Sequence, residues 1–251
     1  MTLPTRLRST HIGLLWTLAF LVFVLAGFST NAIGQTDLRD VRRRLGPAAL
    51  TLKGDRTYNF GGQVVRCQPN QDVGIMAESI TSLTITDVIV DGCTVGIIAT
   101  GPSVRVERVT VRDTTGVCML LAGGYSTAFE NRATGCAYGI VILGNDNTLT
   151  NNQSNDNAQD GIIVTGDGNL LEGNEALRNR GVGIHVVRMV PMAGEGRFLT
   201  LIQDLATGNV IQGNRALDNG VDLEEFGDCQ LGLPNEWRGN TFKTGRPDCV
   251  K

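Results

Sequence analysis

Apolar and polar residues alternate in short runs along most of the chain. Residues 83–86, 104–107 and 109–111 follow a period of two, which is typical of β-strands because successive side chains point to opposite faces. Gly, Asn and Asp separate these runs, and all three residue types favour turns. No helical stretch long enough for a crossover lies between the runs. We therefore predict short parallel strands that are joined directly by tight turns.

A longer repeat groups these strands into coils. An apolar residue, two spacers and an asparagine recur between about residues 131 and 240, and a glycine-bounded apolar triplet follows. Asn152 and Asn174 are 22 residues apart, as are Asn157 and Asn179. A fixed period of this length indicates stacked coils, and short parallel strands without helices between them have to wind as a β-helix.

Two columns of asparagine mark the expected corners of these coils. Asparagine tolerates the left-handed conformation that a sharp turn needs, and its amide can bond the copy in the next coil. A column of this kind could also recognise a sugar, but we interpret both columns as structural ladders. The first contains Asn131, Asn152, Asn174, Asn214 and Asn240, and the second contains Asn157, Asn179 and Asn219.

The first 34 residues have the pattern of a cleavable export signal. Basic residues, among them Arg6 and Arg8, precede the uncharged apolar run 13–28, which is shorter than the roughly 20 residues of a membrane-spanning helix. Small residues before Gln35 predict cleavage after Gly34; an uncleaved membrane anchor is the alternative. We expect a secreted or periplasmic protein with one domain at 35–251.

A short helix is predicted directly after the signal, at residues 36–46. Leu38, Val41 and Leu45 share one helical face, and Gly46 is followed by a proline that stops the helix. The first coil of a solenoid needs a cap for its apolar end, and we assign that role to this helix. A disordered arm is the alternative.

An insertion of 18 residues interrupts one coil. Ile162 to Asn169 spans 7 residues, whereas the matching stretch from Ile184 to Asn209 spans 25. The extra residues lie at about 188–207, and a loop that leaves a solenoid is a common place for binding or catalytic groups. Its apolar residues have helical spacing, so we expect it to pack on the body of the protein.

Charge and cysteine content narrow the class of protein further. The chain has a formal net charge of −3, which argues against binding to nucleic acid or to an anionic membrane surface. Its cysteine count of 6 is even, which in an exported chain favours disulfides over metal or redox chemistry. We expect Cys229 and Cys249 to pair because they share the terminal segment, 229–251. The pairing of the others stays open: Cys67, Cys93, Cys118 and Cys136.

The apolar triplets predict which side chains point away from the core. If the first residue of each triplet fills the core, the next one faces outward. This outward column lacks the basic residues or calcium-binding carboxylates of a polyanion cleft, which counts against a lyase or epimerase working on this face. The insertion, a second subunit or a ligand could cover it. The column consists of Ile98, Leu120, Val141, Ile163 and His185.

His185 is the one histidine outside the signal segment. It could act as a general base, or it could be a surface residue under the inserted loop. A lone histidine is too little for a metal site, and we expect no metal and no other cofactor. Acidic stretches at 156–160 and 222–225 could hold calcium, although solvated turns explain them more simply. The weak candidates for catalysis are His185, Arg188, Glu195, Arg197 and Asp204.

The asparagine pair spaced by four residues and followed by Gly-Ile-x-Val resembles the right-handed parallel β-helix repeat family, from about residue 60 to 245. The resemblance implies an all-β fold, a single-stranded right-handed parallel β-helix of ~22-residue coils with a short N-terminal capping helix. Members are secreted or periplasmic proteins that bind or hydrolyse carbohydrates. The segment 235–249 resembles the terminal coil of such proteins, where Cys249 would pair with Cys229.

The chain lacks the catalytic motifs of the pectate lyases, polygalacturonases and alginate epimerases of that family. It has neither the Asn-Thr-Asp and Gly-His-Gly motifs nor the Asp-Pro-x-Tyr-Gly motif, so no catalytic residue is carried over. The resemblance implies a polysaccharide-binding protein without an identifiable catalytic motif, and whether it is an enzyme stays open. One alternative is a polysaccharide lyase or hydrolase with its site near His185 and the 188–207 insertion. Another is a structural or adhesive surface protein that self-associates through the face formed by Ile98, Leu120, Val141 and Ile163.

Overall fold

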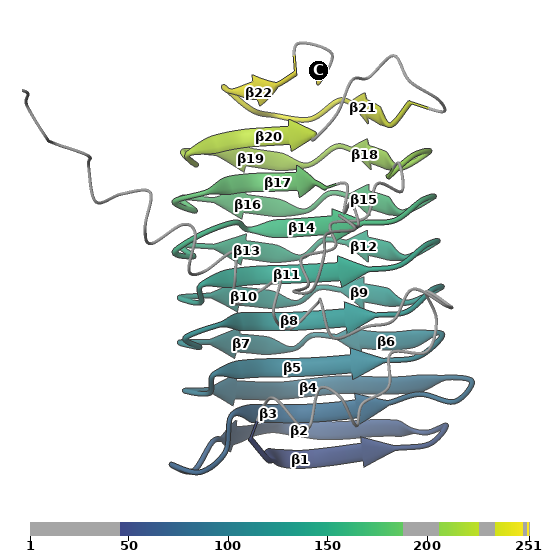
Figure 1. Ribbon diagram of the computed structural model, residues 1–251, viewed down its shortest axis with the longest axis vertical. Coiled ribbons are helices and arrows are strands. Elements are labelled where there is room, and N and C mark those ends of the chain that lie inside the picture. Colours follow the sequence, from purple (N-terminus) through teal and green to yellow (C-terminus); the bar gives the residue numbers. More distant parts are fainter. Residues whose placement is uncertain (1–45, 188–205, 226–233, 248–249, 251) are drawn as a thin grey trace, which may run out of the picture.

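The computed structural model describes residues 46–187, 206–225, 234–247 and 250. Every element in these ranges is a β-strand, and every strand pair is parallel. The coils stack along one axis (Figure 1), so the predicted parallel β-helix is confirmed. The predicted helix at 36–46 lies outside the described residues except for Gly46. The described ranges contain no helix that could cross a membrane.

One flank of the β-helix is a nine-stranded sheet, here called sheet A, to which each coil contributes one strand. Its strands run in chain order along the axis, as Figure 1 shows. They are β1 (Ala48–Lys53), β3 (Val73–Glu78), β5 (Val95–Thr100), β8 (Val117–Ala122), β11 (Tyr138–Leu143), β14 (Ile162–Thr165), β17 (Val182–Val186), β20 (Val221–Glu225) and β22 (Gly245–Arg246).

The rest of the wall is a thirteen-stranded sheet, here called sheet B. It begins with two long strands, β2 (Thr57–Arg66) and β4 (Leu83–Asp91). Beyond β4 a corner divides each coil's contribution into two short strands. The strands before the corner are β6 (Val104–Glu107), β9 (Thr127–Phe129), β12 (Thr148–Thr150), β15 (Leu170–Glu172), β18 (Val210–Gln212) and β21 (Glu236–Arg238). Those after it are β7 (Thr110–Arg112), β10 (Arg132–Thr134), β13 (Gln153–Asn155), β16 (Glu175–Leu177) and β19 (Arg215–Leu217).

From the corner between β9 and β10 onward, each corner is made by a residue in the left-handed region followed by the residue of the asparagine column. Asn151 has a φ of 55° and precedes Asn152, and Gly173 has a φ of 63° and precedes Asn174. Left-handed geometry is unfavourable for most L-residues and is best tolerated by Gly, Asn and Asp. A strand of three residues, one left-handed residue and one asparagine together give the spacing of five between successive corners.

The first asparagine column forms a hydrogen-bonded ladder, as predicted. The backbone N–H and the Nδ2 of Asn152 both donate to Oδ1 of Asn174, each over 2.9 Å. Nδ2 of Asn152 also donates to the carbonyl oxygen of Ala128 at 2.8 Å. This pattern satisfies side chains that are almost completely buried. It repeats along the whole column: Asn131, Asn152, Asn174, Asn214 and Asn240.

The second predicted column also forms a ladder, from Asn157 through Asn179 to Asn219. A third ladder, which the sequence analysis missed, lies at the corner between sheet A and the first short strand of sheet B. Its members stand five residues before those of the first column. They are Asn147, Asn169, Asn209 and Asn235.

Two carboxylates close two of these ladders at their C-terminal ends. Oδ1 of Asp222 accepts from the backbone N–H and Nδ2 of Asn219, both at 3.1 Å. Oε1 of Glu225 accepts from Nδ2 of Asn235 at 2.9 Å. The acidic stretch 222–225 therefore terminates hydrogen-bond ladders. No group of three or more His, Cys, Asp or Glu in the described part of the chain is arranged to hold a metal ion.

Two disulfides hold the N-terminal half of the β-helix, Cys67–Cys93 and Cys118–Cys136. Disulfides persist in oxidising compartments, so the fold belongs in the periplasm or outside the cell. Both cysteines of the predicted Cys229–Cys249 pair lie outside the described residues, and that pairing stays a prediction.

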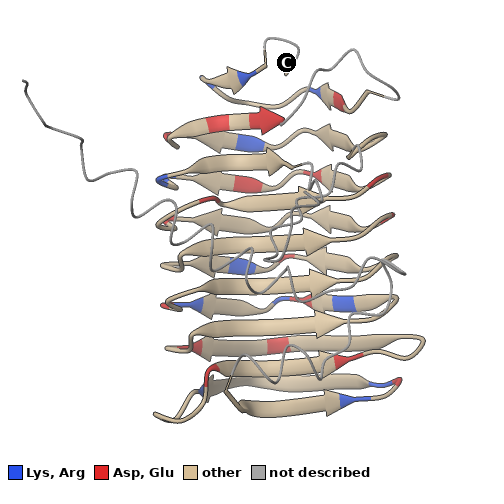
Figure 2. Cartoon of the chain, in the orientation of Figure 1, with Lys and Arg blue, Asp and Glu red and all other residues tan. Residues whose placement is uncertain are grey.

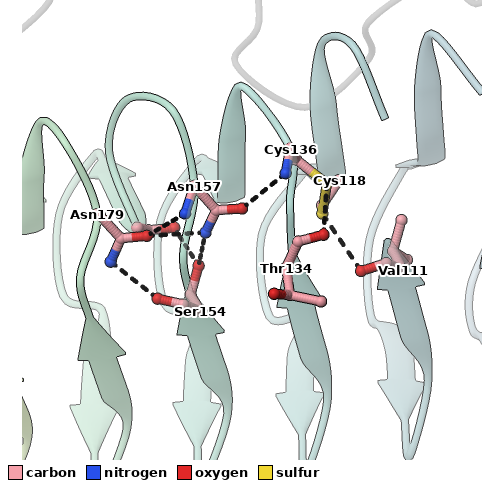
Figure 3. Close-up of a disulfide and its surroundings, with 8 residues drawn as sticks. Val111, Cys118, Thr134, Cys136, Ser154, Asn157 and Asn179 are labelled. Atoms are coloured by element: carbon pink, nitrogen blue, oxygen red, sulfur yellow. Dashed lines mark hydrogen bonds between the residues drawn. A yellow bond between two sulfur atoms is a disulfide. The ribbon is translucent and has the colours of Figure 1, made fainter. Parts of the chain in front are cut away.

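The Cys118–Cys136 bond takes the place of a glycine–asparagine contact found in later coils. Gly139 and Asn157 stand at the same two positions one coil further on, and a Cβ on Gly139 would lie 2.9 Å from Nδ2 of Asn157. The backbone N–H of Cys136 donates to Oδ1 of Asn157 at 3.1 Å, which connects the disulfide to the second ladder. Figure 3 shows the disulfide beside Asn157 and Asn179.

The outer face of sheet A carries a second apolar cluster, separate from the core inside the coils. Ile98, Leu120, Val141 and Ile163 are partners in register across neighbouring strands. Figure 2 shows no charged residue on β5, β8, β11 and β14. These four side chains are only 0–4% exposed. The segment 188–205, predicted to cover this face, lies outside the described residues.

Candidate functional site

The apolar outer face of sheet A becomes polar at its C-terminal end. His185 on β17 is in register with Ile163 on one side and with Glu224 on β20 on the other. Arg246 on β22 is in register with Glu224. Figure 2 shows the acidic residues of β20 above the uncharged strands. The predicted outward column therefore continues through His185 into charged residues, which the sequence analysis did not follow.

An aspartate fixes the orientation of the His185 ring. Nδ1 of His185 lies 2.9 Å from Oδ2 of Asp160, and the side chains are 18% and 16% exposed. Oδ1 of Asp160 accepts the backbone N–H of Val182 at 2.7 Å, so the carboxylate is itself held in place. Because an ionised carboxylate can only accept, the neutral imidazole carries its proton on Nδ1. The other ring nitrogen, Nε2, then presents a lone pair.

Nε2 of His185 faces a second carboxylate without bonding to it. It lies 4.0 Å from Oε2 of Glu224. The nitrogen is buried and has no hydrogen-bond partner among the described residues. A buried polar atom of this kind costs about 1–3 kcal/mol, and such atoms are often found where function requires them. The arrangement can accept a hydrogen bond, or a proton, from a ligand hydroxyl group.

The structure places Asp160 and Glu224 beside His185, and neither was predicted as its partner. Arg188, Glu195, Arg197 and Asp204 lie outside the described residues and stay predictions. Asp160 and Glu224 belong to the two acidic stretches that the sequence analysis considered for calcium, so their link to His185 was missed.

Register could have revealed both carboxylates. Ile162 and Ile184 are partners in register. Asp160 stands two residues before Ile162 and Val182 stands two residues before Ile184, so Asp160 and Val182 occupy the same position in successive coils. Glu224 occupies the position of His185 in the next coil. The distance from Asn219 to Glu224 is one residue shorter than that from Asn179 to His185. This shortening and the 18-residue insertion together conceal the match in the sequence.

The sequence and the fold assign the chain to a known family. Residues 95–246 match the family described as right handed beta helix region, and this stretch is more than half of the 251 residues. The chain therefore belongs to the right-handed β-helix family. No curated protein gives a significant sequence match.

Solved structures with a similar fold include alginate epimerases. One mutant of the periplasmic alginate epimerase AlgG is 18% identical with a TM-score of 0.52, covering 84% of this chain and 54% of its own. Another AlgG mutant is 17% identical with a TM-score of 0.50, covering 68% and 48%. The A-module of the Azotobacter vinelandii mannuronan C-5 epimerase AlgE4 is 13% identical with a TM-score of 0.45, covering 80% and 73%. The chain spans about half the length of the two AlgG chains, and these likenesses show the fold alone.

Proposed function

We propose that the protein is an exported polysaccharide-binding β-helix whose ligand contacts the outer face of sheet A at His185 and Glu224, with Asp160 holding the His185 ring in place. The observation that carries this proposal is the buried Nε2 of His185, which has no partner among the described residues and lies beside a carboxylate at the polar end of an apolar face. Hydroxyl groups of a sugar suit this site because each can donate to Nε2 and also accept from a neighbouring donor.

Other features of the chain support the same proposal. The proteins named as alginate epimerases share the fold, and we extend polysaccharide as the ligand class to this chain. The signal pattern at 1–34, with cleavage after Gly34, would release a domain at 35–251 into the compartment in which the disulfides persist. The formal net charge of −3 is consistent with a ligand other than nucleic acid.

Binding to immobilised polysaccharides tests this proposal. We expect the wild-type protein to bind at least one polysaccharide in a panel of neutral and acidic glycans. His185→Ala should weaken that binding about tenfold or more, because it removes the Nε2 acceptor, worth about 1.5 kcal/mol. The exposed residue Gln153 on sheet B provides the control, and Gln153→Ala should bind like the wild type. A folded wild-type protein that binds none of the glycans would rule the proposal out.

A second function, cleavage of the bound polysaccharide, is favoured by one contact. The Asp160–His185 hydrogen bond orients Nε2 as an acceptor, which is the arrangement of a general base supported by a carboxylate. If this chemistry operates, Asp160→Asn should slow product release about 10²–10⁴-fold while polysaccharide binding changes little. Reducing-end assays and binding assays on the same variant separate the two effects. A wild-type protein that binds a polysaccharide but releases no product from it would leave binding as the function.

A further inference from the structure

A separate hollow lies on sheet B, near the N-terminal end of the β-helix. Asn59 of β2 pairs with Thr86 of β4, but Gln63 is the next residue to pair, with Val88. Three residues of β2, 60–62, therefore bulge opposite Asp87 alone. Bulges of this kind re-aim side chains and occur next to binding sites. Figure 1 places β2 and β4 at the opposite end of the β-helix from β17 and β20, so the hollow is distinct from the His185 site.

Glycine gives this bulge its shape. Gly61 and Gly62 have φ values of 58° and 85°, which side-chain-bearing residues adopt only with strain. Oδ1 of Asn59 accepts the backbone N–H of Gly61 at 2.9 Å and stabilises the turn. Beside the bulge is a shallow hollow of about 370 Å³ that is open to solvent. Its lining includes Asn59, Gly62, Asp87, Ile89, Arg108 and Thr110.

The charges in the hollow neutralise each other. Nε of Arg108 donates to Oδ1 of Asp87 at 2.8 Å, and its terminal nitrogen donates to Oδ2 at 2.9 Å. The hydrogen bonds from Arg108 and then Thr86 lower the pKa of Asp87 to about 2. Asp87 is therefore ionised at neutral pH, and the guanidinium already has its counter-ion. Neither group is available as a net charge for an ionic ligand.

An apolar surface continues from the hollow. Ile89 is half-buried, and its partner in register on β2 is Val64. Val64 is 42% exposed and is one of three large apolar side chains exposed in the described ranges. The hollow thus combines an aliphatic wall with an amide, a hydroxyl and a neutral ion pair. A sugar ring offers the matching surfaces, C–H groups on its faces and hydroxyl groups around its rim.

We propose that this hollow is a second binding site, specific for an uncharged glycosyl unit of an oligosaccharide. The aliphatic wall contacts a ring face, and Asn59, Thr110 and the outer edge of the ion pair bond its hydroxyl groups. An acidic sugar is disfavoured because its carboxylate would lie beside Asp87 with no free cation to bind. This inference does not depend on the function proposed for the His185 site.

The test is isothermal titration of the full chain with short oligomers of glucose, mannose and galactose, and with oligoglucuronate as the acidic probe. We expect a neutral oligomer to bind and to be preferred over oligoglucuronate. Thr110→Trp should fill the hollow, and Val64→Asp should make the apolar surface beside Ile89 charged, at an exposed position that leaves the fold intact. Each should reduce neutral binding at least tenfold, whereas His185→Ala should retain it.

A charge variant with a matched control sharpens the test. Asp87→Asn should remove the two-point ion pair of Arg108, leave Glu107 as its carboxylate partner at the longer distance of 3.5 Å, and shift the preference toward oligoglucuronate. Asp156→Asn is the control, because Arg178 binds Asp156 in the same two-point manner, at 2.7 and 2.8 Å, away from the hollow. This control should leave both affinities unchanged. Absence of neutral binding, a wild-type preference for oligoglucuronate, or neutral binding that survives both Thr110→Trp and Val64→Asp would overturn the proposal.

Discussion

Replacing Asn174 with alanine is expected to lower the free energy of unfolding by about 4 kcal/mol. The Asn174 side chain accepts two hydrogen bonds from Asn152 and donates to the carbonyl oxygen of Leu149 and to Oδ1 of Asn214. Alanine leaves several of these buried groups without a partner, and each costs about 1–3 kcal/mol. Urea unfolding followed by circular dichroism measures the difference.

Asn145→Ala is the matched control for this variant. Asn145 is exposed, and its Oδ1 accepts one hydrogen bond, from the backbone N–H of Asp167 at 2.9 Å. Its loss should cost less than about 1 kcal/mol. Equal costs for the two variants would show that the buried ladder contributes no more than a surface turn, contrary to our account of the corners.

Removing the second disulfide is expected to have the next largest effect on stability. Cys118 and Cys136 are 18 residues apart, and a bridge over a loop of this length stabilises a fold by about 3 kcal/mol. We expect the double variant Cys118→Ala, Cys136→Ala to unfold at a correspondingly lower urea concentration. The Cys67–Cys93 bond remains in this variant, so the difference in stability reports the loss of the Cys118–Cys136 bond alone.

A second double variant, Cys118→Gly with Cys136→Asn, tests whether a glycine and an asparagine can replace the disulfide at these two positions, as they do in later coils. In later coils the amide donates to a carbonyl oxygen 25 residues earlier, as Asn179 does to Ser154 at 2.9 Å. The equivalent acceptor here is Val111. Oγ1 of Thr114, one coil earlier at the same register, is buried without a partner in the described ranges. The new amide could bond it, so this variant should be about 1–2 kcal/mol more stable than the alanine pair. No gain would argue against the equivalence.

The coil repeat and two of the ladders could be predicted because their spacing is written directly in the sequence. Asn152, Asn157, Asn174 and Asn179 recur at steps of 22 and 5 residues. The third ladder has the same steps, since Asn147 and Asn169 each stand five residues before a first-column member. It was missed because those asparagines follow glycine and aspartate in a stretch that also suits an ordinary loop.

The site could be predicted only in part, because its geometry depends on contacts between coils. The outward position of His185 followed from the apolar triplets, but its partners lie 25 residues before it and 39 residues after it. The second distance includes the insertion, so Glu224 does not stand one 22-residue repeat after His185. The pairing of the other four cysteines was likewise beyond the sequence, since four allow 3 combinations and spacing alone does not rank them.

The carboxylates of Asp222 and Glu225 also limit where a further coil could be added to this β-helix. Each ladder asparagine donates its backbone N–H and one Nδ2 proton to the oxygen of the next member, and Asp222 receives those of Asn219 as a further asparagine would. A duplicated 22-residue module placed between Asn131 and Asn179 would find a donor on one side and an acceptor on the other. A module placed directly after Asn219 or Asn235 would instead have to displace Asp222 or Glu225, whose ionised carboxylates accept hydrogen bonds but have no proton to pass on. Duplication of a coil is therefore easier to accommodate in the middle of this chain than at the two corners that these carboxylates close.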